Sequence, residues 1–127
     1  MKAANKKILI IDSDSTAVFE LFAVFVRQGY EVETSQCVRE AAQRIKDVKF
    51  GCIILDVDLP KMKGYDAVSI LKAIDPEIQI IMTSKDNNMD LEVEVRKQDI
   101  FYYYIKSFGQ VELIEAVRDV FQKQKKA

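Results

Sequence analysis

The sequence has no histidine, no tryptophan and only two cysteines, Cys37 and Cys52. The absence of histidine excludes a histidine-based catalytic triad, and without a CxxC pair a zinc ion has no set of ligands. Cys52 lies inside an apolar run and is expected to be a small buried residue rather than half of a disulfide. Cysteine usage of this kind is typical of a reducing compartment, so we expect a cytoplasmic protein.

Glycine is also scarce, and the four glycines are scattered along the chain. A GxGxxG fingerprint and a Walker loop are therefore both missing. No apolar run is long enough to cross a bilayer, and the polar N-terminus lacks the apolar segment of a signal peptide. The net charge of −1 gives no overall attraction to nucleic acid or to a membrane, and we expect neither as a partner.

The composition that remains suits one globular domain, since 49% of the residues are hydrophobic and 31% are charged. Strand-like and helix-like segments alternate five times, which predicts an α/β fold with a parallel sheet. The runs near 7–11, 51–55 and 78–82 are almost continuously apolar, as expected of central strands covered on both faces. Residues 31–34 alternate instead and suit an edge strand. We expect one domain over 1–127, with its core from about residue 6 to 122.

The clearest helix follows the first strand. Asp14 or Ser15 can cap its N-terminus, and Gly29 ends it. Its apolar residues recur with a helical period and predict one buried stripe, which consists of Val18, Leu21, Phe22 and Phe25.

The segment from Met89 to Arg96 has an ambiguous pattern. Apolar and charged residues alternate there, which locally favours a strand. Its place between the fourth and fifth strands calls for a crossover helix, because parallel strands cannot be joined by a tight turn. We predict a helix with Leu91 and Val95 on one face and Met89 and Val93 on another.

Polar residues follow the apolar runs at the points where four of the strands should end. Asp12 follows the first run, Asp56 the third, Thr83 ends the fourth, and Lys106 follows the fifth. The carboxyl ends of neighbouring parallel strands share one edge of a sheet, and ligand sites of open α/β sheets form there. Carboxylates, a hydroxyl and an amine at one edge indicate a metal-assisted phosphoryl-acceptor site.

With these residues placed, the chain resembles the receiver domain of two-component response regulators over essentially its whole length. The resemblance implies a doubly wound, flavodoxin-like sheet of five parallel strands in the order 2-1-3-4-5, with helices on both faces. It rests on the following elements in order: Asp12, Asp56 followed by Leu59-Pro60 and Gly64, Thr83, Tyr103 three residues before a lysine, and Lys106 followed by Phe108.

The resemblance implies a role for each matching residue. Asp56 corresponds to the phosphoacceptor, whose carboxylate forms an aspartyl phosphate. Two anions meet in that step, so a divalent cation is needed, and Mg²⁺ suits oxygen ligands. Asp12, Asp56 and the backbone carbonyl of Asp58 are the implied ligands, with Asp14 or Ser13 as a further candidate.

The remaining matching residues act on the phosphoryl group after transfer. Lys106 corresponds to the lysine that pairs with its oxygens, and Thr83 to the hydroxyl that hydrogen-bonds it. Thr83 and Tyr103 correspond to the switch pair of the family.

The resemblance also implies the partners. A histidine kinase or phosphotransfer protein donates the phosphoryl group, and the surface formed by helix four, strand five and helix five then changes. Exposed Met89 or Val93 would let that surface bind a downstream protein, an effector domain of the same chain or a second copy. The protein is then a signalling phosphoacceptor rather than an enzyme, with at most weak autophosphorylation and autodephosphorylation.

Three positions depart from the family pattern, one of which is Asp99, at a glycine-type position at the end of the fourth helix. Ser13 stands where a second acid is usual, so the implied Mg²⁺ site is expected to be weak, and Ser107 stands where a proline usually follows the lysine. These departures leave open a pseudo-receiver, a constitutive protein-interaction module without phosphorylation.

Two further alternatives are weaker: a flavin binder needs a phosphate cradle after the first strand, and an aspartyl-phosphate phosphatase needs a substrate cap for which the chain has no room.

Overall fold

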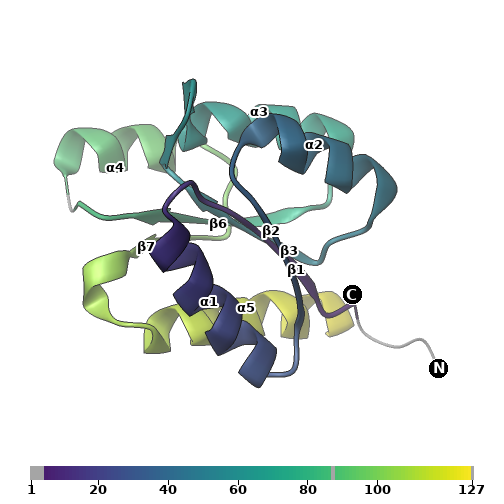
Figure 1. The fold of residues 1–127 in the computed structure, drawn as a ribbon. Coiled ribbons are helices and arrows are strands. Elements are labelled where there is room, and N and C mark those ends of the chain that lie inside the picture. The colour runs from purple at the N-terminus through teal and green to yellow at the C-terminus, as the bar shows by residue number, and fades with distance from the viewer. Residues whose placement is uncertain (1–4, 87, 127) are drawn as a thin grey trace.

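The computed structural model describes residues 5–86 and 88–126, in which strands and helices alternate around one central sheet (Figure 1). The strands of that sheet are β1 (Lys7–Ile11), β2 (Glu31–Ser35), β3 (Cys52–Asp56), β6 (Gln79–Ser84) and β7 (Tyr102–Ile105). They are all parallel and lie in the order β2-β1-β3-β6-β7. Counted along the chain this is the order 2-1-3-4-5, so the predicted fold class is confirmed.

Helices cover both faces of the sheet (Figure 1). Helices α1 (Ser15–Arg27) and α5 (Val111–Lys126) lie on one face, and α2 (Val38–Asp47), α3 (Gly64–Ile74) and α4 (Met89–Arg96) lie on the other. Within the described ranges, no helix combines the length and the apolar character needed to cross a membrane.

The central strands are apolar because both of their faces are covered. In β3, Ile53 and Leu55 pack into the core beneath α2 and α3, whereas Cys52 and Ile54 pack into the core beneath α1 and α5. A strand sends alternate side chains to opposite faces, so two hydrophobic layers demand a continuous apolar run. Cys52 is a free, buried thiol whose pKa is raised by desolvation, as its place in the run predicts.

Helix α1 differs from its prediction at one position. Asp14 is the cap, since its carboxylate accepts hydrogen bonds from the N–H groups of Thr16 and Ala17. Leu21 and Phe25 are buried as predicted, but Phe22 is 40% exposed. The predicted stripe is wider than the surface that the sheet offers, because α1 lies toward the edge strand β2 and Phe22 faces outward beside it.

The ambiguous segment is the helix α4, as its place between two parallel strands predicts. Asn88 caps it through the N–H groups of Asp90 and Leu91. Val95 is buried, whereas Met89 and Val93 are exposed, so the two predicted faces are both present. Helix α4 therefore leaves large apolar side chains in solvent.

A small hairpin lies between β3 and α3. Strands β4 (Asp58–Leu59) and β5 (Met62–Lys63) pair antiparallel across a two-residue turn, Pro60-Lys61. Lys61 has a φ of +72°. Proline at the second turn position and a left-handed residue at the third are typical of a type II turn, for which glycine is the usual third residue. The sequence predicts a turn here but not the paired strands.

Candidate functional site

The strand register brings three of the predicted site residues together at the carboxyl edge of the sheet. Asp56 at the end of β3 is paired with Thr83 of β6. Ile11 of β1 is paired with Leu55, so Asp12, the next residue, lies beside Asp56. All three side chains are buried, with Asp56 only 6% exposed. Two carboxylates and a hydroxyl therefore face one another at a place that water scarcely reaches.

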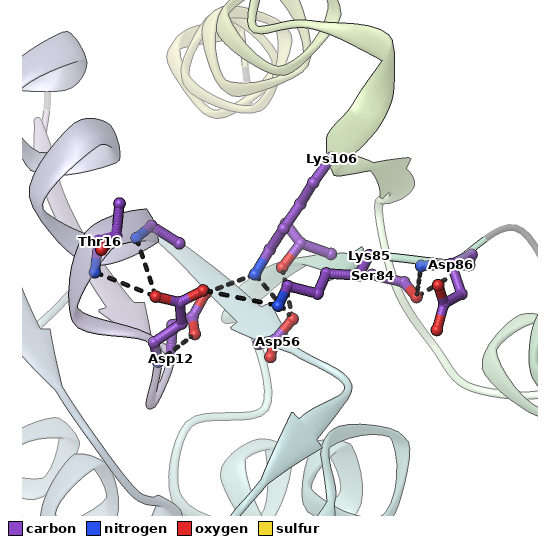
Figure 2. A network of polar contacts seen from close by, with 10 residues as sticks. Asp12, Thr16, Asp56, Ser84, Lys85, Asp86 and Lys106 are labelled. Carbon is purple, nitrogen blue, oxygen red and sulfur yellow. Dashed lines mark hydrogen bonds and ion pairs between the residues drawn. The ribbon is translucent and has the colours of Figure 1, made fainter.

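Lys106 joins the two carboxylates. Its Nζ lies 2.9 Å from Oδ2 of Asp12 and 3.2 Å from Oδ1 of Asp56 (Figure 2). Burial alone would lower the pKa of Lys106, but its hydrogen bonds and charge pairing with both aspartates outweigh burial and raise it. The described residues contain no cis peptide bond, so Lys106 reaches the site through a trans bond to Ser107.

The environment of Asp56 opposes its negative charge. Burial is the largest cause that raises the pKa of its carboxyl, and the nearby charge of Asp12 raises it further. Lys106 and Thr83 act in the opposite direction but do not reverse the shift. Any positive charge added beside Asp56 would therefore stabilise the ionised form of its carboxyl group.

The two oxygens of Asp56 have different surroundings. Oδ1 accepts a hydrogen bond from Oγ1 of Thr83 at 3.3 Å and also pairs with Lys106. Oδ2 makes no contact of this kind with the residues that the structure describes, and it is not among their buried unpaired atoms. Oδ2 is therefore the oxygen that an incoming group can reach.

Asp14 and Ser13 are arranged differently from Asp12. Ser13 is exposed. Oδ1 of Asp14 caps helix α1, and the backbone N–H of Asp14 donates to Oδ1 of Asp12 at 2.9 Å. This cap is the largest cause that lowers the pKa of Asp14. Asp14 is thus mainly a structural residue of the helix start, and its second oxygen remains at the rim.

Two exposed lysines border the carboxylates. Nζ of Lys85, which is labelled in Figure 2 and follows β6, lies 4.0 Å from Oδ2 of Asp14. Nζ of Lys63 lies 3.0 Å from Oδ1 of Asp58 across the β4–β5 hairpin. The side chain of Asp58 is therefore already paired with Lys63, and its backbone carbonyl stays the candidate ligand. Lys85 is not among the site residues predicted from the sequence. Its position directly after the polar end of the fourth strand could have indicated it.

The oxygen donors fit a hard divalent cation in a sparse site. Asp12 and Asp56 provide two adjacent carboxylates, and the raised pKa of Asp56 means that the site favours added positive charge. Mg²⁺ is typically bound by one or two carboxylates together with phosphate and water. Over residues 5–86 and 88–126, no group of three acidic, histidine or cysteine side chains is placed to hold a metal ion. The donor set thus suits Mg²⁺ but lacks a third acid.

Gly64 fixes the backbone beneath Asp56. Its N–H donates to the carbonyl of Val57 at 2.7 Å. A Cβ at this position would lie 2.1 Å from the carbonyl oxygen of Asp56. Only glycine allows this close approach, which holds the end of β3 against the start of α3.

Tyr103 lies in the core on the side of α4. Its ring is buried with Met82 and Val95, and its hydroxyl is the one buried side-chain polar atom in the described part of the chain that has no hydrogen-bond partner. Burying a hydroxyl without a partner is costly. Tyr103 is therefore placed at the boundary of α4 with an unsatisfied polar group.

Residues 8–118 match the family model of the response regulator receiver domain. The chain belongs to this family. The predicted resemblance is thereby confirmed at the level of the family, while the roles of single residues remain predictions. Receiver domains are signalling modules of two-component systems.

Similar proteins agree with this membership. The chain is 28% identical over 117 residues to the chemotaxis protein CheY of Thermotoga maritima, covering 91% of this chain and 98% of that protein. It is 35% identical over 115 residues to the response regulator protein TodT of Pseudomonas putida, covering 87% of this chain but only 49% of the relative. A solved signal receiver domain of an HD domain-containing protein from Pseudomonas fluorescens has a TM-score of 0.90 at 20% identity, covering 99% and 93% of the two chains.

Proposed function

We propose that this receiver domain, over residues 1–127, accepts a phosphoryl group on Asp56 in the cytoplasm. The observation that carries the proposal is the arrangement of Asp56, whose Oδ1 is held by Thr83 and Lys106 while Oδ2 is left to an incoming group. Carboxylates form covalent intermediates in this way when a neighbouring charge compensates the developing anion.

The donor is a phosphorylated histidine of a kinase or phosphotransfer protein. Oδ2 of Asp56 attacks phosphorus, the P–N bond breaks, and the bond's electron pair stays on the imidazole, which then takes up a proton. The product is an acyl phosphate on Asp56. Mg²⁺, when bound by Asp12, Asp56 and the carbonyl of Asp58, supplies positive charge that offsets the repulsion between carboxylate and phosphoryl group.

Lys106 and Thr83 then act on the new group. Lys106 is already within 3.2 Å of Asp56 and can pair with phosphoryl oxygens without a large movement. Thr83 can move its hydrogen bond from Oδ1 to the phosphoryl group. Such a shift at β6 reaches Tyr103 and α4, which form the two-state element that changes the surface of α4, β7 and α5. Exposed Met89 and Val93 make that surface suitable for an effector or a second copy.

The phosphodonor protein is expected to dock on α1. Phe19 is 74% exposed on this helix, and Phe22 lies beside it. Both line a cavity of about 290 Å³ that also includes Asp12 of the phosphoacceptor site. A protein that brings a phosphohistidine to Asp56 must pass over this rim, where the two rings offer apolar contact.

Intact-mass analysis after incubation with acetyl phosphate tests the proposal. We expect a gain of one phosphoryl group that depends on Mg²⁺ and is absent in Asp56→Asn. Labelling that persists in Asp56→Asn would exclude Asp56 as the acceptor, and no labelling at high Mg²⁺ would contradict the proposed function.

Phe19→Ser should slow transfer from a protein donor but not from acetyl phosphate, with Ile70→Ser on α3 as the matched control.

A further inference from the structure

A contact crosses the sheet above Asp56. Asp14 follows β1 and Lys85 follows β6, yet their side chains approach to 4.0 Å. Strand β3 lies between β1 and β6 in the sheet. Neighbouring strands are about 4.8 Å apart, so a contact between the outer two must pass over the end of the middle one. The end of β3 is Asp56.

The backbone on both sides of this contact is anchored. Ser84 is buried, and its Oγ donates to the carbonyl of Asp86 at 3.0 Å and accepts from its N–H at 3.2 Å. These two bonds close a turn with Lys85 at its tip. On the other side, Oδ1 of Asp14 is held by the helix cap, which leaves Oδ2 directed at Lys85. The crossing therefore follows from local structure on both strands.

We propose that Lys85 is a second ammonium group of the phosphoryl site, paired with Asp14 before transfer and with phosphoryl oxygens after it. This inference rests on the proposed function of Asp56. The chain has Ser13 in place of an acid, so the site carries less negative charge and has fewer ligands for a divalent cation. Lys85 adds positive charge at the same rim, and this charge can stabilise the transferred phosphoryl group.

The charge of Lys85 has opposite effects on the two ligands of the site. An ammonium near Asp12 and Asp56 repels a divalent cation and attracts a phosphoryl group. Lys85→Met removes the charge and keeps much of the apolar stem. It should tighten Mg²⁺ binding to the unphosphorylated protein about fivefold, which is the order expected for charges several ångströms apart in water. Because Lys85 is 70% exposed, the change should shrink as salt is added.

The experiment measures Mg²⁺ affinity by isothermal titration calorimetry at low and at high salt. Lys85→Arg keeps the charge and should retain the parent affinity. Lys49→Met is the matched control, since Lys49 is also an exposed lysine paired with an aspartate, Asp75, and it lies at the opposite end of the sheet. Equal affinity in Lys85→Met and the parent, or binding by neither, would overturn the inference.

A second measurement follows labelling by acetyl phosphate as Mg²⁺ is varied. We expect Lys85→Met to be labelled about fivefold more slowly than the parent at saturating Mg²⁺, with the difference narrowing at low Mg²⁺, where the tighter Mg²⁺ binding of the variant compensates. An equal rate at saturating Mg²⁺ would also overturn the inference. If the proposed function is wrong, neither the parent nor any variant is labelled. The Mg²⁺ titration then still shows whether the charge of Lys85 acts on the cation site.

Discussion

The two ends of the same sheet use similar residues in opposite ways. At the amino end, Lys49 and Asp75 form an ion pair at 2.9 Å in which the lysine is 61% exposed. At the carboxyl end, Lys106 pairs with Asp12 and Asp56 at similar distances, but both carboxylates are buried. Exposed pairs contribute little to stability, whereas buried charges dominate their surroundings. Because the side chain of Asp75 is itself only 13% exposed, the two ends differ mainly in the burial of the lysine, which is 61% exposed at the amino end and 19% exposed at the carboxyl end.

The largest effect is expected where the backbone is tightest. Gly64→Ala places a Cβ against the carbonyl of Asp56, and the main chain cannot move aside cheaply. We expect a loss of about 3 kcal/mol in the free energy of unfolding, measured by urea denaturation. Gly29→Ala provides a contrast at the amino end, where the added Cβ meets no atom and the cost is only that of a φ of +93°. Equal losses would show that the carboxyl end is not specially constrained.

The ion pairs provide the most direct contrast between the two ends. Lys106→Met leaves Asp12 and Asp56 facing each other without a cation. We expect the free energy of unfolding to fall by about 2 kcal/mol at neutral pH. This loss is smaller than for a fully buried pair because Lys106 is 19% exposed. Lys49→Met should change stability by less than about 0.5 kcal/mol.

The pH dependence of the Lys106→Met loss has a definite sign. The pKa of Asp56 is already raised, and removing Lys106 raises it further. The ionised carboxylate then destabilises the fold, so the loss should diminish as the pH falls and Asp56 becomes protonated. A loss that is independent of pH between neutral and mildly acidic solution would contradict the role given to charge.

Asp56→Asn should stabilise the protein. A folded-state pKa raised above that of the unfolded chain means that the ionised form opposes folding at neutral pH. Replacing the carboxylate by a neutral amide should therefore add about 1 kcal/mol to the free energy of unfolding. The gain should shrink as the pH falls through the raised pKa, because the parent carboxyl is then neutral as well. A destabilised variant in urea unfolding at neutral pH would disprove this view of Asp56.

The smallest effect concerns the unpaired hydroxyl in the core. Tyr103→Phe removes a buried group that has no hydrogen-bond partner among the described residues. We expect the free energy of unfolding to stay equal or rise by about 0.5 kcal/mol, because no bond is lost and a desolvation cost is relieved. Tyr104→Phe is the matched comparison, since the hydroxyl of Tyr104 donates to the carbonyl of Lys106. A clear loss in Tyr103→Phe alone would indicate a partner for its hydroxyl.

Most of the site at the carboxyl end of the sheet can be predicted from the sequence, because the patterns that indicate it are local. Apolar runs define the strands, and a polar residue at the end of each run marks one edge of the sheet. Asp12, Asp56, Thr83 and Lys106 follow or end such runs, and the register of β1, β3, β6 and β7 brings them together at one edge. The register itself depends on packing across the whole sheet and has no local signal.

The features that the sequence does not predict depend on distant packing. The exposure of Phe22 depends on where the sheet ends beside α1. The left-handed conformation of Lys61 is imposed by the β4–β5 pairing, since nothing in a lysine favours it. Lys85 meets Asp14 only because β1 and β6 flank β3. Each of these is a relation between elements rather than a property of one segment.

The most direct test of the account is to map the phosphorylated residue. The labelled protein is treated with hydroxylamine, which converts an acyl phosphate into a stable hydroxamate, and its peptides are sequenced by mass spectrometry. We predict a single modified residue, Asp56, with Asp12 and Asp58 unmodified. Modification of another residue, or no modification after incubation with a phosphorylated donor and Mg²⁺, would contradict the claim that the buried carboxyl end of this sheet is a phosphoryl acceptor.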